Sequence, residues 1–246
     1  MYSRIPMPKV EWREENRRYS LGFFPLVGLV TGVLLTLWYL LSEYLGINSL
    51  LFAAVSTYLP IFVTGGIHLD GYCDFTDASS SYAAKEKRLE IMSDPHIGSF
   101  AATRACLYLI LQTALFSQLS SLRLVICAAC IFVLSRALSG ILAVTQPSAR
   151  SGGSLQSFVK PSHKRTVIGM EIFFITASAA GMIISAPIPG TAAVIAAFIT
   201  VTYCRYTALK QLGGFTGDVC GWFLQLCEIW ALTGAIIAYR TAEVFS

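Results

Sequence analysis

The chain has 246 residues, of which 55% are hydrophobic and 13% charged, and its mean hydropathy is +0.63. A soluble domain carries about 25% charged residues, so this chain has too few charges to cover a soluble globule of its size. Its net charge of +4 gives no reason to expect a nucleic-acid partner. The composition therefore predicts an all-α, polytopic integral membrane bundle, with 1–246 forming one membrane-embedded domain.

The N-terminal part begins with a polar segment, 1–20, which we expect on the cytoplasmic side. The apolar run 21–45 is long enough to cross a hydrocarbon core of about 30 Å. Within it, Gly28 and Gly32 lie one turn apart, which predicts close approach by a neighbouring helix. The next run, 50–64, is short for a span unless it borrows the residues that follow it.

The polar region 68–99 comes next, and it includes a predicted amphipathic surface helix, 85–92, which ends before Pro95. Five more spans are expected, at 101–119, 122–145, 166–186, 188–209 and 220–239. The total is about seven spans. Lys and Arg then collect in loops on one side, which the positive-inside bias makes cytoplasmic, and the region 68–99 faces that side too.

Three aspartates dominate the polar region. Asp70, Asp74 and Asp77 are spaced by four and three residues, so on a helix they share a stripe of roughly 60° over about 10 Å. Like charges so close together repel. A hard divalent cation neutralises such a stripe and takes oxygen ligands, so we expect a metal site here. The alternative is a solvated acidic helix face.

Several ionisable residues interrupt the apolar runs, where they are expensive and usually functional. They are Arg104, Arg136 and Glu228. For both arginines the alternative is snorkelling, in which the charged end reaches back to the membrane interface, although Arg136 lies further from that interface. Asp218 lies on the same face of the last span as Glu228. It is either part of a functional site or a plain helix N-cap. Arg150 stands in a flexible loop that could wrap a phosphate or be an ordinary solvated loop.

Several short motifs follow one another along the chain, and their combination is distinctive. They comprise 3–8, 25–28, 65–71 with Asp74 and Asp77, 86–92 with Asp94 and 97–98, 135–136, 149–150, and 213–218. In this combination the chain resembles the cobalamin synthase family, the adenosylcobinamide-GDP ribazoletransferases. Ala78, 79–82 and Ala101 depart from glycines that are usual in that family.

The resemblance implies a phosphotransferase of vitamin B12 (cobalamin) biosynthesis. It would transfer adenosylcobinamide phosphate from adenosylcobinamide-GDP to α-ribazole, or to α-ribazole 5′-phosphate, with release of GMP, as the last step of nucleotide-loop assembly. It implies Mg²⁺ as cofactor and a cytoplasm-facing site in the plasma (inner) membrane of a prokaryote. Besides the two substrates and the bilayer, we consider a homo-oligomer or other enzymes of the pathway as partners.

Residue roles follow from the resemblance and the stripe. The predicted magnesium ligands are Asp70, Asp74, Asp77 and Asp94. The predicted catalytic residues are Asp94 and His96, as candidates for the base that activates the ribose hydroxyl. The predicted substrate-binding residues are His68, Lys85, Arg104, Arg136, Arg150, Asp218 and Glu228.

Two other classes of protein compete with this interpretation. A CDP-alcohol phosphotransferase also uses a helical aspartate stripe with Mg²⁺, but its pattern fails here after the dipeptide at 70–71. A membrane transporter would also place carboxylates and arginines in helices. Against it, the acidic stripe lies at a membrane edge and the sequence shows no inverted repeat.

Overall fold

The structure is a computed structural model that describes residues 17–150, 152–153 and 155–245. Over these residues every regular element is a helix and there is no strand, which confirms the predicted all-α class. Most of the polar segment 1–20, including the motif at 3–8, lies outside the described residues. The helices are η1 (Ser20–Phe23), α2 (Phe24–Leu45), α3 (Ser49–Thr64), α4 (Ile67–Ser80), α5 (Lys85–Ile91), α6 (Ser99–Phe116), α7 (Leu122–Thr145), α8 (Gln156–Val159), α9 (Lys164–Ser185), α10 (Pro187–Leu212) and α11 (Gly217–Phe245).

Six stretches in the described part of the chain are long and apolar enough to cross a membrane: η1 with α2, and then α6, α7, α9, α10 and α11. Helices α3 and α4 meet the same test only together, and they bend by 93° at their junction. Counting this pair gives the predicted seven spans. The bend lies at Gly65 and Gly66, whose φ angles of 69° and 83° favour glycine. The short run 50–64 therefore does not extend straight into the residues that follow.

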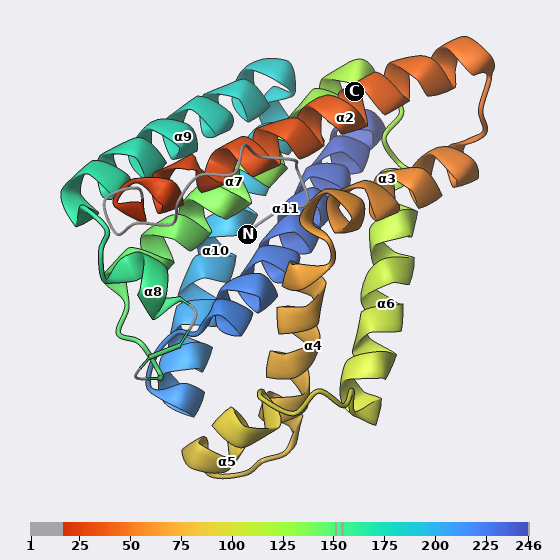
Figure 1. The fold of residues 1–246 in the computed structure, drawn as a ribbon. Helices are drawn as coiled ribbons and strands as arrows, with labels where there is room; N and C mark the ends of the chain where they lie inside the picture. The colour runs from red at the N-terminus through yellow and green to blue at the C-terminus, as the bar shows by residue number, and fades with distance from the viewer. Residues whose placement is uncertain (1–16, 151, 154, 246) are drawn as a thin grey trace.

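Helices α7 and α11 form the centre of the bundle (Figure 1). In their most apolar windows 78% and 72% of the residues are buried, compared with 22–44% in the other four spans. Helix α2 packs tightly on α7, because a Cβ on Gly28 would lie 2.2 Å from the carbonyl oxygen of Phe132. Gly32 is similarly close to Ala129. The predicted close approach at these two glycines is confirmed.

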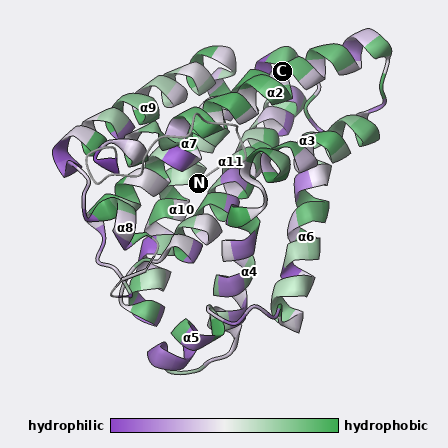
Figure 2. Ribbon diagram, in the orientation of Figure 1, coloured by the Kyte–Doolittle hydropathy of each residue, from purple (hydrophilic) through white to green (hydrophobic). Residues whose placement is uncertain are grey.

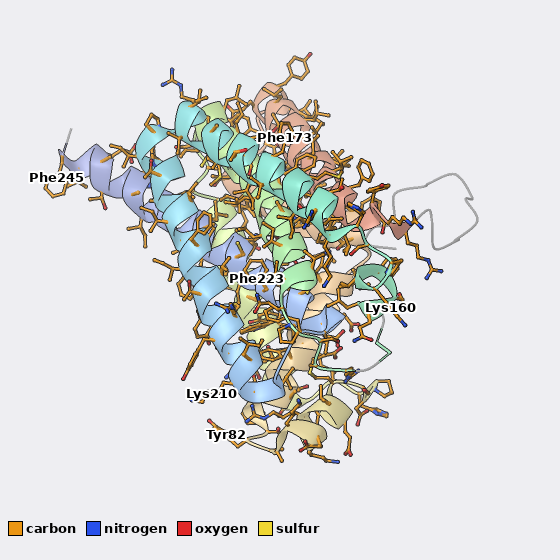
Figure 3. All side chains as sticks on the ribbon, turned by 90° about the vertical axis from the view of Figure 1, so that its left-hand side faces the viewer. Tyr82, Lys160, Phe173, Lys210, Phe223 and Phe245 are labelled. Carbon is orange, nitrogen blue, oxygen red and sulfur yellow. The ribbon has the colours of Figure 1, made fainter. Side chains whose placement is uncertain are left out.

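The bundle has one end that is rich in polar groups, which we call the polar end: residues 81–98, 146–150, 155–163 and 213–217. Figure 2 shows much of the hydrophilic colour on α4 and α5. In Figure 3, Tyr82, Lys160 and Lys210 lie towards this end and Phe245 lies at the other. The segments that the sequence marked as chemically interesting therefore meet at one end.

The loops at the opposite end are short and their helices are capped locally. Asn48 Oδ1 accepts a hydrogen bond from the backbone N–H of Leu51 at 2.9 Å, which caps α3. Ser121 Oγ accepts one from Leu124 at 3.4 Å, which caps α7. These two side chains thus satisfy backbone N–H groups at the starts of α3 and α7.

Candidate active site

The predicted aspartate stripe lies on one helix, α4. Asp70 is exposed, while Asp74 and Asp77 are half-buried. The charge of Asp74 is repelled by Asp70, Asp218 and Asp77 and attracted by Arg150. The structure thus adds a fourth carboxylate and one guanidinium to the stripe, and we call these five side chains the acidic centre.

Asp218 reaches the acidic centre because α11 begins against α4. A Cβ on Gly71 would lie 2.7 Å from Cα of Asp218, so the two backbones are nearly in contact. Asp218 is not the helix N-cap, since Thr216 Oγ1 accepts from the backbone N–H of Val219 at 3.2 Å. The Thr216 hydroxyl also donates to Asp218 Oδ2 at 3.3 Å, which orients that carboxylate.

Arg150 reaches the centre through two loops that are bonded together. Phe215 N–H donates to the Pro147 carbonyl at 2.8 Å, and Ala149 N–H donates to the Phe215 carbonyl at 3.0 Å. Arg150 then donates from its guanidinium to the carbonyl of Leu89 on α5. Its charge also acts on Asp218, so one arginine ties the loop, α5 and the acidic centre together.

Two further predicted cations lie near this end. Lys85 crosses to the glycine turn before α11, where its Nζ would lie 2.8 Å from a Cβ on Gly213. Arg104 is exposed on α6, and its charge acts on the Tyr72 hydroxyl. Both side chains are therefore available to an anionic ligand at the polar end.

Asp77 has a structural task that the sequence did not reveal. Its two carboxylate oxygens accept the backbone N–H groups of Gly98 at 2.6 Å and Ala101 at 2.9 Å. These are donors at the start of α6, a helix whose own N-cap residue provides no side-chain bond. A Cβ on Gly98 would lie 2.6 Å from the Asp77 oxygens, so glycine is needed there.

Asp94 and His96 pair with each other on the turn between α5 and α6. His96 Nδ1 and Asp94 Oδ1 are 2.7 Å apart, and the side chains are 89% and 56% exposed for His96 and Asp94 respectively. The backbone N–H of His96 and then its ring hold the pKa of Asp94 below its ordinary value. This pairing leaves His96 Nε2 free of the aspartate, as a base would require.

Arg136 and Glu228 are brought together in the interior. Arg136 NH1 lies 2.6 Å from Glu228 Oε1, and the two side chains are only 1% and 3% exposed. Ser135 Oγ also donates to Glu228, at 3.1 Å. Both residues were predicted independently to bind substrate, and in this structure each neutralises the other.

His68 lines a cavity of about 190 Å³ beside the acidic centre. The histidine is buried, its ring packs edge-on against Phe24 at 5.6 Å, and its Nε2 has no hydrogen-bond partner among the described residues. Asp70 and Asp218 also line this cavity. The site therefore combines an acidic mouth with a largely apolar cavity.

Glu171 is a buried ionisable residue that the sequence analysis passed over. It lies on α9 and is fully buried, and neither carboxylate oxygen has a partner among the described residues. A Cβ on Gly140 would lie 2.2 Å from Glu171 Oε1. The signal was available, because Glu171 interrupts the apolar run 166–186 just as Glu228 interrupts 220–239.

The described residues contain no group of three or more His, Cys, Asp or Glu side chains gathered closely enough to hold one metal ion. The carboxylates of the acidic centre are neighbours, but they are not close enough together to coordinate one metal ion by themselves. Any ion here needs oxygen atoms from water or a bound molecule to complete its coordination.

The fold and the site together define a polytopic helical membrane protein with an acidic centre at one end. The sequence matches the family model of cobalamin-5-phosphate synthase over residues 1–236. The chain belongs to this family.

Relatives with a printed activity agree with this assignment. A Lachnoclostridium phytofermentans protein named adenosylcobinamide-GDP ribazoletransferase is 40% identical over 97% of this chain and 91% of its own length. Proteins of the same name from Desulfitobacterium hafniense and Clostridium botulinum are 33% and 29% identical. These alignments cover 95% and 96% of this chain, and 92% and 94% of the relatives. No solved structure matches the chain.

Proposed function

We propose that this chain is a transferase that joins adenosylcobinamide phosphate to ribazole or its 5′-phosphate. A ribose hydroxyl attacks the phosphorus that bears the cobinamide arm, and a new phosphorus–oxygen bond forms. The bond from that phosphorus to the bridging oxygen of the diphosphate breaks, GMP leaves, and the hydroxyl proton passes to a base. The membership of the family and the name shared by the relatives carry this proposal.

We also propose that the acidic centre binds Mg²⁺. In support, Asp74 is repelled by three carboxylates and attracted by Arg150 among the described residues. Mg²⁺ is commonly held by one or two carboxylates together with substrate phosphates and waters, which agrees with a centre that is incomplete alone. When bound, the ion neutralises charge that builds on the leaving phosphate. Asp70, Asp74 and Asp218 are the best-placed ligands, and Asp77 and Asp94 remain predicted ones.

Arg150 and Lys85 are the proposed phosphate-binding residues. Arg150 is fixed by Leu89 and directed at the acidic centre, and a guanidinium binds phosphate oxygens through paired N–H groups. Lys85 lies against the glycine turn that leads into α11. Arg104 is exposed at the same end and is retained as a third cation for the diphosphate.

Arg136 and Glu228 act in this proposal by holding α7 and α11 together. These helices carry the loop of Arg150 and the carboxylate of Asp218, so the buried ion pair positions both. The pair Asp94–His96 is the proposed base, with the aspartate orienting the imidazole. Replacing His96 with alanine should then lower kcat much more than it raises either KM.

The polar end is proposed to face the cytoplasm at the plasma membrane. Most of the basic residues in the described part of the chain lie there, and the positive-inside bias makes such an end cytoplasmic. At this end or directly beside it are Arg17, Arg18, Lys85, Lys87, Arg88, Arg104, Arg150, Lys160, Lys164, Arg165, Arg205 and Lys210, compared with Arg123 and Arg240 towards the opposite end. A reporter fused after residue 150 should be accessible only from the cytoplasm.

The proposed function is tested with purified protein, adenosylcobinamide-GDP, α-ribazole and Mg²⁺. Adenosylcobalamin and GMP should form in equal amounts, and Asp70→Asn and Asp74→Asn should lower the rate by at least about 100-fold. Unaltered GMP release in both variants would contradict the role of the acidic centre. A wild-type protein that makes neither product would contradict the function.

A further inference from the structure

The cavity beside the acidic centre is a distinct compartment of the site. It lies between the start of α2, the start of α4, the end of α7, α8 and the start of α11. The residues that line it are Leu21, Phe24, Ile67, His68, Asp70, Ser139, Gly140, Ala143, Leu155, Phe158, Gly217, Asp218, Cys220 and Leu224. At about 190 Å³ it exceeds the cavities of about 150 Å³ that hold one benzene ring, so a bicyclic ring is of the right size.

The walls of the cavity are apolar, and few of the polar atoms on them are available. Phe24, Leu155, Phe158 and Leu224 are buried apolar side chains on this wall, whereas Ile67, Asp70, Gly217 and Asp218 are exposed or half-buried. Ser139 and Cys220 lie next to each other on this wall. His68 Nε2 is left as a buried nitrogen without a partner in the described residues. A buried polar atom of this kind is expensive unless a ligand satisfies it.

This chemistry discriminates among the parts of the two substrates. A guanine base needs several hydrogen-bond partners, a phosphate needs cations, and no lysine or arginine of the described residues lines the cavity. A corrin ring is far too large. The base of ribazole is a dimethylbenzimidazole, which is flat and apolar and has one free ring nitrogen that accepts a hydrogen bond.

We infer that this cavity receives the dimethylbenzimidazole of ribazole, with the buried His68 ring turning so that its unpartnered N–H donates to the free ring nitrogen. The ribose then lies at the mouth, where Asp70 and Asp218 line the cavity and where the acidic centre begins. This inference rests on the proposed function and identifies the place of the acceptor substrate. An acyl chain of a lipid would fill the apolar space but would leave His68 unsatisfied.

The test uses full-length protein in lipid nanodiscs and equilibrium dialysis with α-ribazole. Ala143→Phe should fill the cavity, and Ala114→Phe, the same change at an exposed position on α6, is the matched control. His68→Leu removes the donor and His68→Gln restores one. A riboside of 5,6-dimethylindole, which lacks the free ring nitrogen, is the comparison ligand.

Ala143→Phe should raise the Kd for α-ribazole at least about tenfold, while the KM for adenosylcobinamide-GDP stays unchanged in this variant. The wild type should prefer α-ribazole to the indole riboside by about tenfold. His68→Leu should lose that preference and His68→Gln should recover part of it. An unchanged KM for the other substrate separates a lost subsite from a folding defect.

The inference is overturned if the wild type does not bind α-ribazole, if Ala143→Phe binds it as tightly as Ala114→Phe, or if His68→Leu keeps the full preference. Failure of the proposed function looks different. In that case the wild type binds α-ribazole with the expected preference but forms no adenosylcobalamin from the two substrates.

Discussion

The contact between Gly71 and Asp218 assembles the acidic centre, and Gly71→Ala perturbs it directly. The new Cβ would lie 2.7 Å from Cα of Asp218 and 2.8 Å from its carbonyl oxygen. Ordinary contacts begin near 3.4 Å, so α4 and α11 must separate by about 0.7 Å. Both neighbouring atoms belong to the backbone, so no flexible side chain can move aside. Asp218 then shifts away from Asp70 and Asp74.

A displacement of about 1 Å at a catalytic centre can cost about 100-fold in rate, so Gly71→Ala should lower kcat/KM for GMP release by roughly this factor. Overpacking should cost about 1–3 kcal/mol of stability, offset in part by about 1 kcal/mol of improved helix propensity. The assay is GMP release, with thermal unfolding in the same detergent.

Gly169→Ala is the matched control. Gly169 is an exposed helical glycine on α9, and an added Cβ there would meet nothing within 4 Å. This variant should gain helix propensity and keep full activity. If Gly71→Ala retains activity within threefold of the wild type, the argument that this contact positions Asp218 is refuted.

Variants at three other contacts test those contacts separately. Asp77→Ala removes the acceptor for Gly98 and Ala101, so hydrogen exchange at the start of α6 should accelerate, by an amount equivalent to about 0.5–2 kcal/mol, and unchanged exchange would refute the contact. Arg136→Met leaves Glu228 buried without its partner and should cost about 3–5 kcal/mol in thermal unfolding, whereas Arg136→Met/Glu228→Leu should recover most of this loss. His96 lowers the pKa of Asp94, so the Asp94 carboxylate stays ionised to a lower pH than usual. Its pairing with His96 is present above this lowered pKa and is lost as the pH falls through it. In His96→Ala an NMR titration should find the pKa of Asp94 closer to the ordinary value.

Local patterns in the sequence predicted the local features of the structure. Hydropathy and length gave the spans, and the spacing of Asp70, Asp74 and Asp77 gave one stripe on one helix. The amphipathic pattern of 85–92 gave α5, which ends at Ile91. Gly28 and Gly32 indicated where a neighbouring helix would pack closely, although not that the neighbour would be α7.

Partners far apart in the chain could not be predicted in this way. Arg136 and Glu228 are 92 residues apart, so the pattern indicated two expensive charges but not that each neutralises the other. Asp77 bonds to donors 21 and 24 residues away, which depends on where α6 begins relative to α4. The bend at Gly65 and Gly66 also depends on packing, because a pair of glycines permits a turn of any angle.

Asp70, Asp74 and Asp218 are proposed to bind a divalent cation together with the diphosphate. Titration of Mn²⁺ followed by electron paramagnetic resonance, in nanodiscs with and without adenosylcobinamide-GDP, measures this binding. The wild type should bind Mn²⁺ much more tightly when the substrate is present, and Asp74→Asn should lose at least about tenfold in that affinity. Equal Mn²⁺ affinity in the wild type and in Asp74→Asn would contradict the claim.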